Sequence, residues 1–83
     1  MQTLLDVTDV QTQADYILFL AFENGESRRF DMKPYLHLKP WQALNNTSLF
    51  NQAKIEFGTV VWPGEIDIDP EALYERSELI NHP

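Results

Sequence analysis

One segment, running from Trp62 to Tyr74, constrains the fold more than any other part of the chain: Trp-Pro-Gly-Glu-Ile-Asp-Ile-Asp-Pro-Glu-Ala-Leu-Tyr. It combines a strand end, a proline–glycine turn, a run of carboxylates and the start of a helix. Asp69 has the side chain of a good N-cap, and Pro70 suits the first helical position, where an N–H is not needed. Glu71 complements the positive end of the helix dipole. The segment therefore predicts that the final helix begins at Pro70.

The same helix should be anchored through apolar side chains. Ile68, just before the cap, can pack on Leu73 as a hydrophobic staple. Helical periodicity directs one face toward a sheet, and that face consists of Ala72, Leu73, Arg76 and Leu79 or Ile80. We expect the helix to fray at Asn81, His82 and Pro83.

Length and composition favour a single small domain over residues 1–83. A chain of this size buries only about 60 to 65% of the surface that its unfolded form exposes, so most apolar side chains must serve the core. The absence of cysteine excludes disulfides and thiolate metal sites. There is neither an export signal nor a run of about 20 apolar residues. We therefore expect a cytoplasmic protein without a membrane contact.

The N-terminal part of the chain predicts β structure. A first strand is expected over Leu4–Val10, and an asparagine–glycine pair between two later stretches indicates a hairpin. In this hairpin Tyr16–Phe22 pairs with Glu26–Met32 across a two-residue type I′ turn at Asn24-Gly25. Both faces of the Tyr16–Phe22 strand are apolar, which predicts a central strand covered on each side.

The middle of the chain predicts short helical turns followed by more strands. Prolines favour one-turn helices over Pro34–Leu36 and Pro40–Leu44, and Thr47 can cap a further turn, Ser48–Gln52. Two short strands follow on either side of Gly58, Ala53–Phe57 and Thr59–Trp62. The expected fold is α+β: a small, mostly antiparallel sheet with an N-terminal hairpin, short helical turns in the middle and a C-terminal helix packed on the sheet.

The net charge of −7 is unevenly distributed. Residues 1–26 and 65–78 are acidic, whereas five of the six basic side chains lie between these segments. Binding to nucleic acid requires a basic stripe, which a few separated cations on an acidic domain do not supply. We therefore expect no nucleic-acid contact and favour a basic protein as partner. Surface acid that only keeps a small domain soluble is the simpler alternative.

Four carboxylates are candidates for a chemical site, Glu65, Asp67, Asp69 and Glu71. Alternating oxygen ligands can bind a hard cation, but a calcium loop runs about twelve residues with a central glycine, a pattern that this segment lacks. Two carboxylates can also carry out acid–base hydrolysis, yet Asp67 and Asp69 on an extended segment point the same way, too close together for most glycosidases. A helix cap beside a solvated strand end, without metal or cofactor, is favoured.

Tryptophan is common both in cores and in binding surfaces. In a domain short of core volume we favour a core or core-edge position for Trp41 and Trp62. Trp62 is the better binding candidate, because it ends a strand beside the acidic run. As an exposed aromatic platform rimmed by carboxylates, it could receive an arginine or lysine from a partner.

The order of several of these features resembles that of a known family. The residues that carry the resemblance are Asn24-Gly25-Glu26, Phe30-Asp31, the Leu44–Phe50 segment, Trp62-Pro63, Asp67-Ile68-Asp69 and Leu73-Tyr74. Over nearly the whole chain they resemble the small bacterial family catalogued as domain of unknown function 2442. The resemblance implies an α+β fold without an established activity. It also implies a protein-binding role, because some members are encoded beside another small protein in pairs similar to toxin–antitoxin modules.

The sequence therefore favours a non-enzymatic protein-binding module, antitoxin-like in its relation to a neighbouring small protein. The candidate contact residues are Trp62, Glu65, Asp67, Asp69 and Glu71. No nucleophile–base pair is indicated, because the chain has no cysteine and its three serines fit structural positions in a strand, a cap and a helix surface. His37, the only histidine inside the predicted fold, is interpreted as a residue of a bend. Two alternatives stay open: a carboxylate-based metal-binding protein or hydrolytic enzyme at residues 65–71, and a structural subunit that forms a homo-oligomer.

Overall fold

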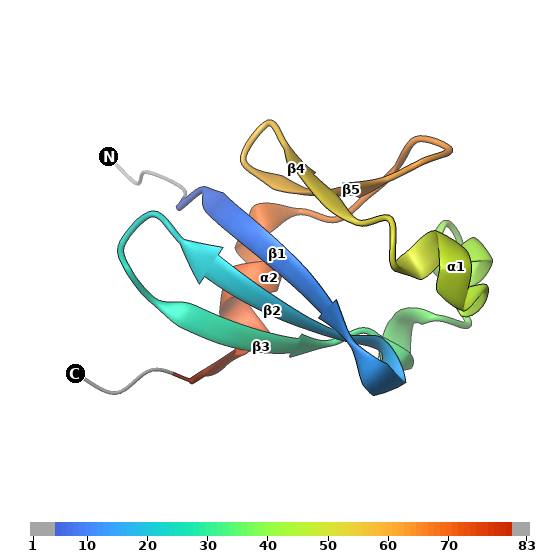
Figure 1. Cartoon of the computed structure of the whole chain (residues 1–83), viewed down its shortest axis with the longest axis horizontal. Coiled ribbons are helices and arrows are strands. Elements are labelled where there is room, and N and C mark those ends of the chain that lie inside the picture. The colour runs from blue at the N-terminus through green and yellow to red at the C-terminus, as the bar shows by residue number, and fades with distance from the viewer. Residues whose placement is uncertain (1–4, 81–83) are drawn as a thin grey trace.

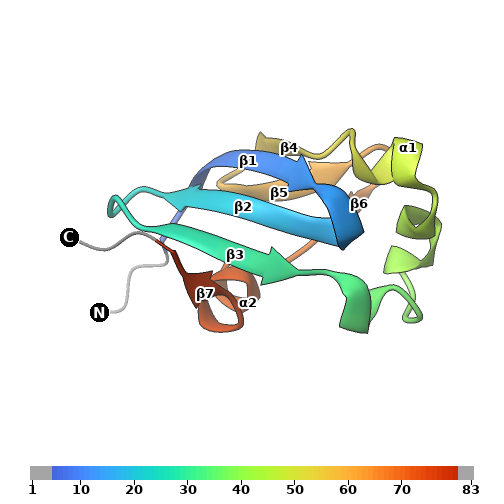
Figure 2. The ribbon, with the colours of Figure 1, turned by 60° about the horizontal axis from the view of Figure 1, so that its bottom comes forward.

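The computed structural model describes residues 5–80 as two antiparallel sheets connected by short helices (Figure 1). The larger sheet has the strand order β1-β2-β3-β7, and the smaller sheet has the order β4-β5-β6. The helix α2 and strand β7 lie together beside β3 (Figure 2). The predicted α+β class, hairpin, helical turns and C-terminal helix are confirmed, but the strands divide into two sheets rather than one.

The larger sheet contains the predicted hairpin. Its strands are β1 (Val7–Gln13), β2 (Ile17–Phe22), β3 (Ser27–Asp31) and β7 (Glu78–Leu79). Strands β2 and β3 pair from Ile17 opposite Asp31 to Ala21 opposite Ser27, as expected. Strand β1 continues beyond its predicted end because its pairing with β2 extends to Gln13. The predicted start at Leu4 lies outside the described residues.

The turn between β2 and β3 is not the expected type I′ turn. Gly25 has a φ of +89°, but Asn24 is not among the non-glycine residues of the described chain that have positive φ. The Gly25 N–H donates to the Phe22 carbonyl at 2.9 Å, and Asn24 Oδ1 accepts from the Glu26 N–H at 3.0 Å. Asn24 thus serves as a side-chain acceptor in a three-residue loop with one left-handed glycine.

The smaller sheet lies next to β1. Its strands are β4 (Lys54–Glu56), β5 (Thr59–Trp62) and β6 (Ile66–Asp67). Strand β4 is shorter than predicted because Phe57 belongs to the turn: Phe57 and Gly58 have φ of +55° and +76°. Two consecutive left-handed residues are typical of the type I′ turn. The Val7 N–H donates to the Gly58 carbonyl at 2.9 Å and so links the two sheets.

Short helices occupy the connections. They are three 3₁₀ helices, η1 (Ala14–Tyr16), η2 (Lys33–Tyr35) and η3 (Trp41–Asn45), and the α-helices α1 (Thr47–Phe50) and α2 (Pro70–Glu75). Helices η2 and η3 confirm the two turns predicted from proline. The cap predicted at Thr47 is one residue too late, because the Asn46 side chain accepts from the Ser48 N–H at 3.0 Å. Asn46 is the N-cap because its side-chain oxygen reaches the N–H two residues further along the chain.

Helix α2 begins where the sequence predicts but ends early. Asp69 is its N-cap and Glu75 its last residue. Ile68 and Leu73 are both buried in the same cluster, as a hydrophobic staple requires. The face predicted to meet the sheet is only partly correct, because three of its members are exposed, Arg76, Leu79 and Ile80. The predicted frayed residues 81–83 lie outside the described chain.

Arg28 of β3 accounts for the early end of α2. Its Nε donates to Ser77 Oγ at 2.8 Å, and its guanidinium lies 4.3 Å from the centroid of the Tyr74 ring. A second nitrogen donates to the Ser77 carbonyl at 3.3 Å. These contacts hold the chain after α2 against β3, where Leu79 pairs with Arg28. The residues expected to form the last helical turn therefore form β7.

The core lies on one face of the larger sheet. On β2, Leu18, Leu20 and Phe22 are at most 2% exposed, whereas Phe19 on the opposite face is 40% exposed. Strand β2 is central in order, but its second face is covered only in part: on that face Ile17 is buried and Ala21 is half-buried, whereas Phe19 is exposed. Helix α2 and the smaller sheet contribute to the same apolar cluster as Leu18, so neither covers the face that carries Phe19.

Candidate functional site

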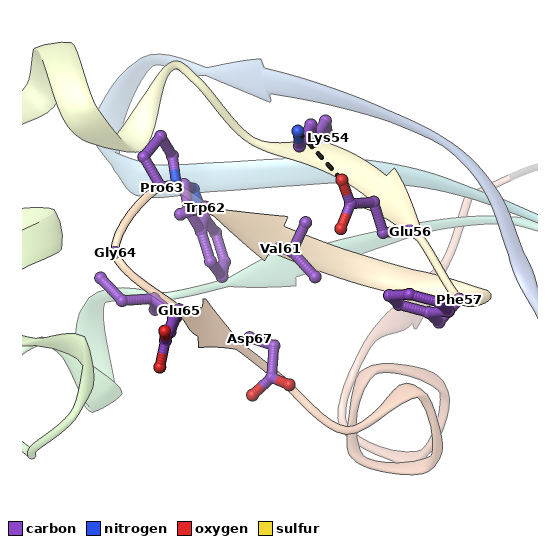
Figure 3. Close-up of a pocket in the computed structure, with 10 residues that line it drawn as sticks. Lys54, Glu56, Phe57, Val61, Trp62, Pro63, Gly64, Glu65 and Asp67 are labelled. Carbon is purple, nitrogen blue, oxygen red and sulfur yellow. Dashed lines mark ion pairs between the residues drawn. The ribbon is translucent and has the colours of Figure 1, made fainter.

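The outer face of the smaller sheet forms an open hollow of about 450 Å³ (Figure 3). The strand register places Lys54 of β4 and Asp67 of β6 on either side of Val61 of β5. Val61 is half-buried and supplies an apolar floor between the two charged side chains. The turn at residues 63–65 closes one end of the hollow, and Phe57 stands at the other.

Carboxylates dominate the rim of this hollow. Glu56, Glu65 and Asp67 line it, and all three side chains are exposed. Among the described residues, Lys54 is the one basic residue that lines the hollow, and its Nζ lies 3.0 Å from Glu56 Oε2. Within residues 5–80, Glu65 and Asp67 take part in no ion pair. Three predicted contact residues therefore line the hollow, Trp62, Glu65 and Asp67, and the two carboxylates leave negative charge available to a partner.

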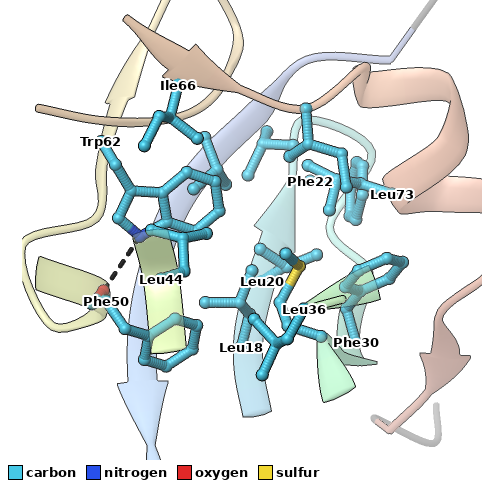
Figure 4. Packing of buried hydrophobic residues seen from close by; sticks show 14 residues of the cluster. Leu18, Leu20, Phe22, Phe30, Leu36, Leu44, Phe50, Trp62, Ile66 and Leu73 are labelled. Atoms are coloured by element: carbon cyan, nitrogen blue, oxygen red, sulfur yellow. Dashed lines mark hydrogen bonds between the residues drawn. The ribbon is translucent and has the colours of Figure 1, made fainter. Parts of the chain in front are cut away.

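Trp62, the first of the predicted contact residues, is part of the core. It is only 2% exposed, its Nε1 donates to the Phe50 carbonyl at 2.9 Å, and its ring stacks on that of Phe50 (Figure 4). The ring therefore cannot act as the exposed aromatic platform considered above, and the favoured core position is confirmed. Trp41 is at the core edge, where its indole N–H donates to the Asp67 carbonyl at 3.0 Å.

Asp69 and Glu71 lie away from the hollow, at the start of α2. Asp69 Oδ1 accepts from the Glu71 N–H at 3.0 Å, which confirms the predicted N-cap. The helix start thus separates the four predicted carboxylates into two pairs. In the part of the chain that the structure describes, no three His, Cys, Asp or Glu side chains are grouped so that they could hold a metal ion.

Phe57 is the most exposed large apolar side chain of the described chain. It lies at the tip of the β4–β5 hairpin, 96% exposed and in the left-handed region of φ. Glu56 precedes it, and the two side chains line the same hollow. The hollow therefore joins an exposed ring, an apolar floor and a carboxylate rim on one surface.

Most of the described chain matches the sequence pattern of a known protein family. The family described as Protein of unknown function (DUF2442) matches residues 7–78, from the start of β1 into β7. The chain belongs to the DUF2442 family. No curated protein and no solved structure matches this DUF2442 chain. Because the family has no assigned function, the function has to be argued from the site.

Phe57 is not among the site residues that the sequence of this DUF2442 chain predicts. The sequence predicts it as the last residue of the strand Ala53–Phe57. The signal that could have found it is the dipeptide Phe57-Gly58 between two short strands, the position at which Asn-Gly usually forms a type I′ turn.

The helices of residues 5–80 are all too short or too polar to span a membrane.

Proposed function

We propose that this chain is a non-enzymatic protein-binding module that uses the outer face of the smaller sheet. The observation that carries the proposal is the hollow itself, with an apolar floor at Val61, a carboxylate rim and an exposed Phe57 at one end. Protein interfaces combine an apolar centre with a polar rim in the same way. The composition of this surface therefore supports a macromolecular contact more than a small-molecule reaction.

The favoured partner is a basic protein, such as a small protein encoded beside this one in an antitoxin-like pair. The chain carries a net charge of −7, and Glu65 and Asp67 lie exposed at the hollow. Complementary charge accelerates association and selects between partners, while contributing less to affinity when the charges stay in water. The acidic rim would then set the rate and specificity of binding, and the apolar centre its lifetime.

The proposal is tested by removing the two rim charges without disturbing the core. The double variant Glu65→Gln with Asp67→Asn is compared with wild type in capture from native cells, quantified by mass spectrometry. We expect one dominant basic protein with wild type, released at high salt, and at least about tenfold less of it with the double variant at about 0.15 M salt.

A matched control separates the site from total charge. The double variant Asp9→Asn with Glu75→Gln makes the same change of net charge on β1 and α2, and neither residue lines the hollow. This control should capture as much partner as wild type. Equal loss in both double variants, or no loss in either, would remove the hollow as the binding surface. Light scattering of the purified chain measures its molar mass in solution and so tests the alternative hypothesis, a structural subunit that forms a homo-oligomer.

A further inference from the structure

We infer that Phe57 is the anchor of this interface and inserts its ring into an apolar pocket of the basic partner, with arginine or lysine side chains around the pocket mouth. The inference rests on the proposed function and adds the mode of contact and the shape of the partner. It differs from aromatic stacking at Trp62, whose ring is buried.

Phe57 is an unfavourable residue at its position unless something covers it. With 96% of its surface exposed, its ring gains none of the stabilisation that burial of an aromatic side chain brings. Its φ of +55° adds backbone strain, which is marked for bulky side chains. Asparagine would avoid both costs at the first position of a type I′ turn. A contact outside the chain would account for phenylalanine here.

The hairpin tip is held rigidly, as an anchor requires. Glu56 pairs with Thr59 across the turn, and the Gly58 carbonyl accepts from the Val7 N–H at 2.9 Å. The Asp6 carboxylate packs against Gly58 so closely that a Cβ there would lie 2.5 Å from Asp6 Oδ1. Because the backbone of the tip is already fixed by these contacts, ordering the Phe57 side chain is the main conformational cost of binding at this position.

The charges of the side chains near Phe57 indicate which charges should surround the receiving pocket on the partner. Glu56 and Asp67 lie on the same outer face as Phe57; Lys54 balances the charge of Glu56, whereas Asp67 takes part in no ion pair within residues 5–80 (Figure 3). Arginine or lysine at the mouth of the receiving pocket would meet these carboxylates as the ring enters. A second copy of this chain fits poorly, because it carries the same net charge of −7 and would oppose carboxylate to carboxylate. The charge pattern therefore favours a different, basic protein.

The direct test places the photo-crosslinking amino acid p-benzoylphenylalanine at position 57 and irradiates the full chain in its native cells. We expect one dominant crosslinked protein, with the crosslinked peptide bordered by apolar residues and by arginine or lysine. The same amino acid at position 19, which is also an exposed aromatic site, is the control. A crosslink to a second copy, to an acidic protein, or no crosslink above the control would overturn the inference.

A binding measurement then quantifies the anchor. Phe57→Asn removes the ring but suits the left-handed φ, so the variant should be at least as stable as wild type. Its affinity for the crosslinked protein should fall at least about 30-fold, as for other interface anchors. Phe57→Tyr should bind within a few-fold of wild type. If Phe57→Asn binds normally while the Glu65→Gln, Asp67→Asn variant does not, the proposed function stands and the anchor role fails.

Discussion

At the residue scale, two glycines in hairpin turns are required for different physical reasons. Gly25 and Gly58 both have left-handed φ, +89° and +76°. A Cβ on Gly25 would meet nothing within 4 Å, whereas on Gly58 it would meet the Asp6 carboxylate at 2.5 Å. Gly25 is thus required for its φ alone, and Gly58 for its φ and for the close approach of Asp6.

This difference predicts unequal costs of substitution by alanine. Gly25→Ala should lower the free energy of unfolding by about 1 kcal/mol, from backbone strain alone. Gly58→Ala should lower it by about 2 kcal/mol, because the Asp6 side chain must also move. Urea denaturation measures both values. Asp6→Ala combined with Gly58→Ala should bring the second loss close to the first, and identical losses for the two single variants would contradict the steric argument.

At the element scale, neighbouring arginines of β3 have unequal roles. Arg28 is mostly buried, with 15% of its side chain exposed, and bonds to Ser77 and Glu26 while lying over Tyr74. Arg29 is 45% exposed and makes one long contact, 3.5 Å from its Nη1 to Glu78 Oε1. The first arginine joins α2 and β7 to the sheet, whereas the second lies on the solvent side.

Arg28→Met should therefore loosen β7. We expect the free energy of unfolding to fall by about 2 kcal/mol and the amide of Ile80, which donates to the Ser27 carbonyl at 2.8 Å, to exchange at least about tenfold faster. Arg29→Met should change stability by less than about 0.5 kcal/mol. Hydrogen exchange with denaturant unfolding provides both readouts. Equal effects of the two substitutions would show that Arg28 does not hold the C-terminal strand.

At the scale of the whole molecule, two carboxylates couple stability to pH. Burial by itself would raise the pKa of Glu26, but hydrogen bonds from Tyr74 and Arg28 outweigh it and hold the pKa below its ordinary 4.5. Burial by itself would likewise raise the pKa of Asp31. The backbone N–H and the ammonium group of Lys33 outweigh this effect and hold the pKa of Asp31 below its ordinary 3.8. The folded chain then takes up protons less readily than the unfolded chain.

Stability should consequently be full at neutral pH, begin to fall as the pH drops below about 4.5, and continue to fall through the lowered pKa values of the folded state. Glu26→Gln should be less stable than wild type at pH 7, and the two proteins should converge as the pH falls through the lowered pKa of Glu26 in the folded state. Melting temperatures over a pH series that descends from 7 measure this. Glu75→Gln, at an exposed carboxylate of α2, should follow the wild-type curve. A constant gap between Glu26→Gln and wild type would contradict the linkage.

Sequence by itself determined the features of this protein that depend on a few neighbouring residues. The start of α2 followed from Asp69 and Pro70, because a helix N-terminus is satisfied by side chains within one turn. The β2–β3 pairing followed from an apolar run that ends at an asparagine–glycine turn. Of the candidate site, Glu65 and Asp67 were found, because they belong to one acidic run in the sequence: Glu65 directly precedes β6 and Asp67 is its last residue.

Only the tertiary structure decided where distant segments meet. The end of α2 depends on Arg28, which reaches Ser77 across 49 positions of sequence. The division into two sheets, the burial of Trp62 and the exposure of Phe57 likewise depend on which faces pack together. Helix caps and turns are stabilised by hydrogen bonds between residues that are close in sequence. Burial of a side chain, in contrast, depends on how all apolar faces of the chain pack together. Local patterns therefore predicted the elements, and packing selected the side chains that remain free to bind a partner.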